Sequence, residues 1–153
     1  MKKKKTPNAQ RRTPNIEFRG GRVFETPNHE YSATRKQKYD LEQRLLEFTA
    51  LIVQLADSLP NTKAGNHIAG QLLRCGTSPL ANHGEVEAAE SRKDFLHKLR
   101  ICLKELRETW RWLRLVGRLE LVEAEKLRAG LLEVEELIRI FAASVRTTER
   151  NAK

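Results

Sequence analysis

The chain is poor in cysteine and aromatic residues and has no long apolar run. Only two of its 153 residues are cysteines, and 6% are aromatic. The cysteines do not form the even, closely spaced set of a secreted disulfide scaffold, and no charged-then-apolar signal segment opens the chain. Arg, Lys or Glu interrupts every apolar run before it reaches the ~18 residues of a membrane span. We therefore expect one compact, soluble, cytoplasmic domain.

The motifs of nucleotide-dependent and metal-dependent catalysis are also missing. The sequence contains no P-loop, no G-x-G-x-x-G, no G-x-S-x-G, no C-x-x-C and no H-x-x-x-H. Candidate ligands that are close in sequence are His83, Glu85, Glu87 and Glu90. The thiols of Cys75 and Cys102 fall in apolar stripes, where cysteine behaves as a small hydrophobe. We expect neither a metal ion nor a cofactor.

Positive charge is concentrated at the beginning of the chain. The net charge is +9, and residues 1–38 hold 11 Lys or Arg against 3 Glu. Three Thr-Pro-Asn triplets and few apolar residues predict a disordered tail over 1–38. Its lysines Lys2, Lys3, Lys4 and Lys5 could contact phosphates without sequence preference, although such tails also occur as solubilising extensions.

From residue 39 onward the apolar residues recur at steps of three and four, the period of one helix face. The first stripe is Leu41, Leu45, Phe48, Ile52, Leu55 and Leu59. The second begins with Ile68, Leu72 and Cys75. The third is Phe95, Leu99, Cys102, Leu106, Trp110 and Leu113. The fourth is Leu127, Leu131, Val134, Ile138, Phe141 and Val145. Four helices with short connections over residues 39–150 predict an all-α, antiparallel up-down four-helix bundle.

Helix ends are marked by capping and breaking residues. Pro60 stops the first helix, and Ser91 followed by Asp94 resembles a capping box that opens the third. Gly117 is the expected left-handed cap at the end of the third helix. The second helix should run from about 64 to 87 and kink at Pro79, since the apolar phase continues across that residue.

Two smaller residues of this second helix have predicted structural roles. Gly76 is small enough to let a neighbouring helix approach closely. Asn82 lies on the inner side and could satisfy polar groups near the bend. Both roles favour a helix bent for packing over a catalytic loop around His83 and His97.

Several apolar residues lie off the main stripes. They are Leu46, Leu51, Val53, Leu96, Leu103, Trp112, Leu132 and Leu137. A broad core face would bury them, whereas a contiguous exposed patch would indicate subunit contacts. Trp112 points about 200° away from Trp110 on a helix, so we select Trp112 as the candidate subunit contact.

A regular basic stripe follows the third helix. Its members are Arg100, Lys104, Arg107, Arg111, Arg114 and Arg118, at steps of 4, 3, 4, 3 and 4. We expect these residues to contact nucleic-acid phosphates. The alternative is a purely structural row of ion pairs, in which nearby carboxylates neutralise the stripe. Those carboxylates are Glu105, Glu108, Glu120, Glu123, Glu133 and Glu136.

An enzymatic alternative rests on Arg92 and His97. Together they form R-x-x-x-x-H, the spacing of the catalytic motif in HEPN-type ribonucleases, which are also helical bundles. His97 would act as general acid or base and Arg92 would hold the phosphate, without a metal. A separation of five residues turns two side chains about 140° apart on a helix. Arg92 and His97 would therefore converge only with a dimer partner or at a helix start.

Residues 72–116 resemble the four helix bundle proteins related to those encoded in intervening sequences of bacterial 23S ribosomal RNA genes. The positions that carry the resemblance are Leu73, Arg74, Thr77, Ser78, Ala81, Asn82, Glu85, Ser91, Arg92, Asp94, Phe95, Lys98, Lys104, Glu105, Glu108, Trp112 and Leu113. Residues 135–148 are similar as well, so the resemblance covers residues 39 to about 150.

The resemblance implies a bacterial, cytoplasmic antiparallel bundle without a known catalytic centre, which assembles into homopentamers in relatives. The accessory proteins of diversity-generating retroelements are similar in fold and use a basic pentamer surface for nucleic acid and reverse transcriptase. The resemblance thus implies a non-enzymatic homo-oligomer, a pentamer as in relatives, with RNA or another nucleic acid as its partner.

Overall fold

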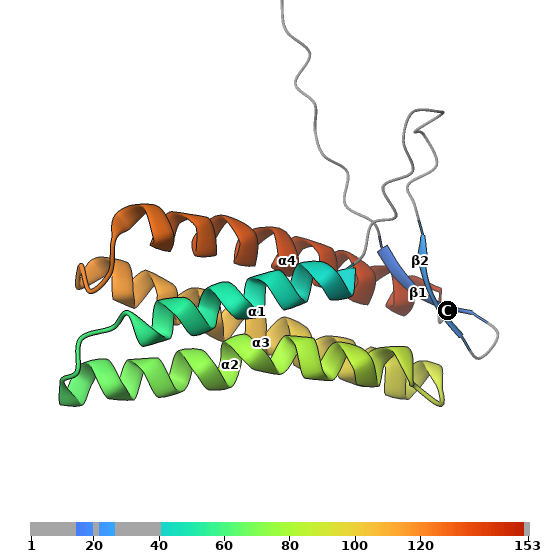
Figure 1. Cartoon of the computed structure of the whole chain (residues 1–153). Coiled ribbons are helices and arrows are strands. Elements are labelled where there is room, and N and C mark those ends of the chain that lie inside the picture. The colour runs from blue at the N-terminus through green and yellow to red at the C-terminus, as the bar shows by residue number, and fades with distance from the viewer. Residues whose placement is uncertain (1–14, 20–21, 27–40, 152–153) are drawn as a thin grey trace, which may run out of the picture.

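The computed structural model describes residues 15–19, 22–26 and 41–151. Its helices are α1 (Leu41–Asp57), α2 (Lys63–Glu87), α3 (Arg92–Arg118) and α4 (Ala124–Arg150). Successive helices run in opposite directions along one bundle, as an up-down arrangement requires (Figure 1). Each helix packs against the one before it, and α4 returns to α1. The predicted all-α four-helix fold is confirmed.

Side-chain caps set the beginnings of α2 and α3. The Ser91 hydroxyl accepts a hydrogen bond from the Asp94 N–H at 3.1 Å, as the sequence predicted. Asp94 Oδ2 in turn accepts from the N–H of Glu90 at 3.3 Å. Thr62 caps α2 in the same way and accepts from the Gly65 N–H at 3.0 Å. These bonds satisfy amides that have no partner within the helix.

The end of α3 differs from the prediction. Gly117 remains inside the helix, where an added Cβ would come within 2.7 Å of Leu127 Cδ2. The left-handed residue is instead Glu120, with φ of 53°. Its N–H donates to the Gly117 carbonyl and the Leu121 N–H donates to the Val116 carbonyl, each at 3.2 Å. This is the hydrogen-bond pattern of a Schellman cap, so Gly117 permits close packing and Glu120 ends the helix.

The second helix continues through Pro79 without interruption. Its continuity is therefore confirmed, while the kink stays a prediction. A Cβ on Gly76 would come within 2.5 Å of Ile52 Cγ2, so the expected close approach of α1 and α2 is present. Asn82 Nδ2 donates to the Ser78 carbonyl at 2.9 Å and to its hydroxyl oxygen at 2.8 Å, as expected of a residue that satisfies polar groups near Pro79.

The core follows the predicted stripes on α1, α2 and most of α3. On α4 the buried face is rotated from the predicted stripe, because Leu131 and Ile138 are only half-buried. Leu137, predicted to lie off the stripe, is fully buried, and Leu103 on α3 is buried as well. The buried residues of α4 are Leu127, Gly130, Val134, Leu137, Ile140, Phe141, Ser144, Val145 and Thr148. Trp110 is half-buried at the edge of the core instead of lying within it.

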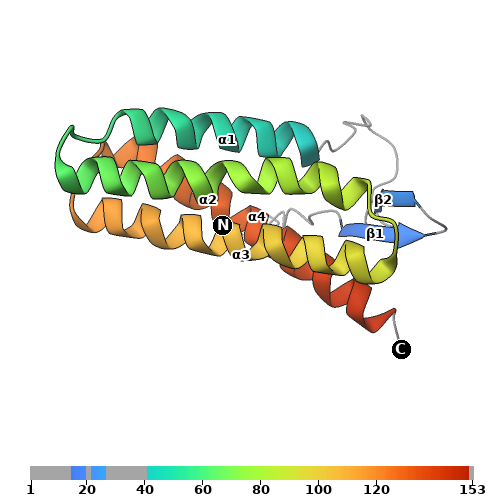
Figure 2. The same ribbon diagram turned by 90° about the horizontal axis from the view of Figure 1, so that it is seen from below.

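Residues 1–38, predicted to be disordered, include one described element. The strands β1 (Asn15–Arg19) and β2 (Arg22–Thr26) pair antiparallel, with Asn15 opposite Thr26 and Arg19 opposite Arg22. Figures 1 and 2 both show this hairpin at the end of the bundle where α2 passes into α3, and β1 contacts α4. The tail lysines Lys2, Lys3, Lys4 and Lys5 lie outside the described residues.

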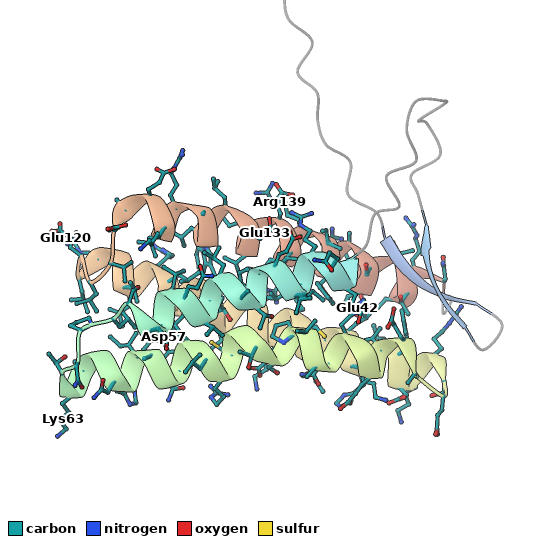
Figure 3. The ribbon with its side chains drawn as sticks, in the orientation of Figure 1. Glu42, Asp57, Lys63, Glu120, Glu133 and Arg139 are labelled. Carbon is teal, nitrogen blue, oxygen red and sulfur yellow. The ribbon has the colours of Figure 1, made fainter. Side chains whose placement is uncertain are left out.

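The cap at Glu120 generates a stability prediction. Glu120→Gly should raise the free energy of unfolding by about 0.5–1 kcal/mol, because glycine adopts positive φ without a Cβ clash. Urea unfolding followed by circular dichroism measures this change. Glu120→Gln is the matched control, since it removes the charge near the helix C-terminus but keeps the Cβ. Equal stability of the Gly and Gln variants would contradict the backbone explanation. Figure 3 shows Glu120 at the end of the bundle.

Candidate nucleic-acid interface

The six residues of the basic stripe lie on the solvent side of α3. All six are exposed, whereas Phe95, Leu99 and Leu106 on the opposite side of the helix are fully buried. From Arg100 to Arg118 the stripe extends about 27 Å at 1.5 Å per residue. The predicted alignment of these cations is thus present in the fold.

Three of the carboxylates that could have neutralised the stripe pair with other cations. Glu133 binds Arg44 of α1, with Oε2 3.0 Å from Nη2. Glu136 lies 2.7 Å from Arg139, and Glu123 lies 3.4 Å from Lys126. Glu133 and Arg139 both lie on α4 (Figure 3). These acids belong to ion pairs within α4 or between α4 and α1.

The two carboxylates of α3 itself face α2 and pair with Arg74. Arg74 Nη1 lies 3.8 Å from Glu105 Oε2, and Arg74 Nη2 bonds Glu108 Oε1. Glu105 is buried, at 7% exposure, so its charge is directed into the α2–α3 contact. Neither acid pairs with the basic stripe.

Within the described residues, only one member of the stripe forms an ion pair. Arg100 Nη2 lies 2.7 Å from Glu149 Oε1 of α4. Lys104, Arg107, Arg111, Arg114 and Arg118 have no carboxylate within 4 Å in this part of the chain. Five exposed cations on one helix face therefore keep their charge available to a partner.

Trp110 borders the stripe on the side of α4. Its Nε1 donates a hydrogen bond to Glu135 Oε1 at 3.2 Å. The guanidinium carbon of Arg114 lies 4.5 Å from the centroid of a Trp110 ring, a cation–π contact. The sequence assigned Trp110 to the core and did not identify this arrangement.

Two hollows lie along the same side of α3. One, of about 460 Å³, is lined by Arg111, Arg114, Leu115, Gly117, Arg118 and Leu131. The other, of about 390 Å³, is lined by Arg107, Trp110, Arg111, Glu135, Ile138 and Arg139. The sequence identified the arginines of α3 but assigned Leu131 and Ile138 to the core. Because the side chains of Leu131 and Ile138 are only half-buried, they line these hollows.

Trp112 lies on the other side of α3, as its angular offset predicted. Its ring meets His67 of α2 edge-on, with centroids 6.0 Å apart and an interplanar angle of 71°. The side chain is half-buried, so part of it faces solvent. The two tryptophans occupy separate environments, and a subunit contact at Trp112 stays a prediction.

Other apolar residues are exposed on the outside of the bundle. Those with large exposed side chains are Leu46, Val53, Leu115, Leu119 and Leu132. Leu46, Val53 and Leu132 were among the residues predicted to lie off the stripes. The bundle alone does not cover them.

Arg92 and His97, the candidate ribonuclease pair, are both exposed at the start of α3. The Arg92 guanidinium donates to the Asn151 carbonyl beyond the end of α4. No hydrogen bond joins Arg92 to His97 in the described part of the chain. Their catalytic role is not supported by a shared contact.

The remaining candidate ligands lie inside the bundle or apart. His83 is buried, with its ring edge-on to Phe141 at 6.4 Å between centroids. Cys75 and Cys102 are fully buried, and burial raises the pKa of the Cys102 thiol to about 12. Among residues 15–19, 22–26 and 41–151, no three His, Cys, Asp or Glu residues cluster in a way that could hold a metal ion. None of the helices described is long and apolar enough to span a membrane.

Comparison with known proteins identifies relatives of this bundle. The 23S rRNA-intervening sequence protein family matches residues 37–143. A solved structure of a protein of unknown function from the S23 ribosomal protein family of Bacteroides thetaiotaomicron is 36% identical, with a TM-score of 0.65. The match covers 69% of this chain and 98% of that one. No curated protein matches. The chain belongs to the 23S rRNA-intervening sequence protein family.

Proposed function

We propose that this protein is a non-enzymatic, homo-oligomeric binding protein of the cytoplasm that contacts nucleic-acid phosphates through the basic stripe of α3. The observation that carries the proposal is the set of five exposed cations without carboxylate partners among the described residues. Arginine is suited to this role because its planar guanidinium donates paired hydrogen bonds to phosphate oxygens. The contact needs no metal ion or cofactor.

Assembly would strengthen the electrostatic effect. A ring of subunits repeats the stripe around an axis and focuses a positive field, which raises the association rate of a polyanion. The pentamers of family relatives support such a ring, and the basic tail adds further charge. Because phosphate contacts do not read base sequence, RNA recognition by the stripe alone should be non-specific.

The stripe predicts a steep dependence of RNA affinity on salt. Arg107→Glu/Arg111→Glu should flatten the plot of log affinity against log salt by about 1.4–1.8 in slope, for two lost phosphate contacts. Fluorescence anisotropy with labelled RNA over a salt series measures the slope. A chain starting at Tyr39 separates the contribution of the tail.

The control for this experiment is Lys63→Glu/Lys126→Glu, which makes the same change in net charge away from the stripe. Lys63 is exposed at the start of α2 (Figure 3), and Lys126 is exposed on α4. If the stripe variant keeps the wild-type slope, or if the chain starting at Tyr39 loses all binding, the stripe is only a structural feature.

The candidate subunit contact can be tested at Trp112. Trp112→Ala should lower the molar mass measured by light scattering, because interface tryptophans commonly dominate binding energy. Trp110→Ala is the matched control, with the same truncation on the other side of α3. Circular dichroism shows whether each variant remains folded. A folded Trp112→Ala variant with the wild-type mass would count against this contact.

The alternative function, a metal-independent HEPN-like ribonuclease using Arg92 and His97, makes an opposite prediction. Under our proposal, RNA incubated with the protein and EDTA stays intact, and His97→Ala changes nothing. Gel electrophoresis of the RNA measures cleavage. Cleavage by the wild-type protein that disappears in His97→Ala would replace our proposal with the ribonuclease.

A further inference from the structure

The two hollows beside the basic stripe share a boundary residue. Arg111 lines both of them, and each reaches from α3 across to α4. We call the two hollows together the α3/α4 groove. Its two parts, of about 460 and 390 Å³, fall within the ~300–1,000 Å³ range of small-molecule pockets.

The chemistry of the α3/α4 groove goes beyond phosphate binding. Arg107, Arg111, Arg114 and Arg118 supply cations along α3, while Leu131 and Ile138 of α4 supply an apolar floor. A phosphate gains nothing from an apolar surface, since burying a charge beside it loses hydration. This combination suits a ligand that carries charged groups and apolar groups close together.

The second hollow also holds a hydrogen-bond acceptor beside its three arginines, Arg107, Arg111 and Arg139. Glu135 lines the second hollow, where its Oε1 accepts from Trp110 Nε1 and its Oε2 lies 3.7 Å from Arg139. A carboxylate repels phosphate but accepts hydrogen bonds from the exocyclic amine of a base. The second hollow can therefore hold a base beside Glu135, while its arginines remain available to the flanking phosphates.

The contact between Arg114 and Trp110 adds a planar surface at the groove. Guanidinium groups and indole rings both stack on bases, and this contact brings one of each together beside the groove. Single-strand binding sites combine these elements, since a basic groove follows the backbone while planar side chains take the bases.

We propose that the α3/α4 groove binds single-stranded RNA, with phosphates on the arginines of α3 and an unpaired base against Trp110, Ile138 and Glu135. This inference rests on the proposed function and specifies its ligand. A duplex is excluded from the second hollow because its bases are stacked and paired, and the deep A-form major groove hides their edges. Duplex RNA meets only the outer arginines.

The first test compares a single-stranded RNA of about 12 nucleotides with a duplex of the same sequence. Two single-tryptophan proteins report on each side of α3: Trp112→Phe retains Trp110, and Trp110→Phe retains Trp112. The single strand should quench Trp110 fluorescence and leave Trp112 unchanged, and the duplex should quench neither.

The second test measures the ratio of single-strand to duplex affinity by anisotropy. Trp110→Leu should lower this ratio about tenfold, as expected when one stacked base is lost. Trp112→Leu is the matched control and should leave the ratio unchanged. A general loss of avidity affects both ligands and leaves the ratio constant, so the ratio reports the base contact.

The outcomes separate the two proposals. Salt-dependent binding of both ligands with equal affinity and no response of Trp110 overturns the single-strand inference and leaves the phosphate-binding stripe intact. No binding of either RNA overturns both. A fall in molar mass on Trp110→Leu without a change in the affinity ratio would assign the α3/α4 groove to another copy of the chain and overturn the single-strand inference.

Discussion

The burial of one side of α3 determines where its charges lie. Phe95, Leu99, Leu106 and Leu113 are fully buried between α2 and α4. Burying each such side chain contributes about 2 kcal/mol, whereas an exposed ion pair contributes at most ~1 kcal/mol. The rotation of the helix is thus set by its apolar residues. Arg107, Arg111 and Arg114 lie on the opposite side of the helix. They therefore face solvent even though their like charges repel one another.

Charge pairing then decides which side of α3 stays basic. On the side of α2, Arg74 lies beside both Glu105 and Glu108, so the named acids outnumber the base there. On the side of α4, Glu133 is directed to Arg44 and does not reach the stripe. A count of acids and bases along the sequence predicts near-neutrality for residues 39–153, but it does not describe this separation. The basic surface results from the rotation of α4 as much as from the arginines of α3.

The parts of the fold that depend on local chemistry were predictable. The recurrence of apolar residues at steps of three and four residues locates all four helices. Ser91 specifies the start of α3 through one hydrogen bond. The end of α3 was not predictable, because the choice between Gly117 and Glu120 depends on Leu127 packing against Gly117. The hairpin was missed although Gly20-Gly21 joins two short β-prone runs, a recognised turn signal. The basic, proline-containing context around it favoured disorder.

The α3/α4 groove illustrates a limit of reading single helices. Leu131 and Ile138 continue the apolar period of α4, yet the helix is rotated so that Leu137 and Ile140 are buried in their place, beside the other residues of the predicted stripe. This rotation depends on two-helix geometry, since Gly130 brings α4 close to Leu55 and Leu113. It leaves Leu131 and Ile138 half-buried beside Trp110 and the arginines. An apolar floor next to a basic edge is thus a consequence of packing two amphipathic helices, and neither sequence stripe reveals it alone.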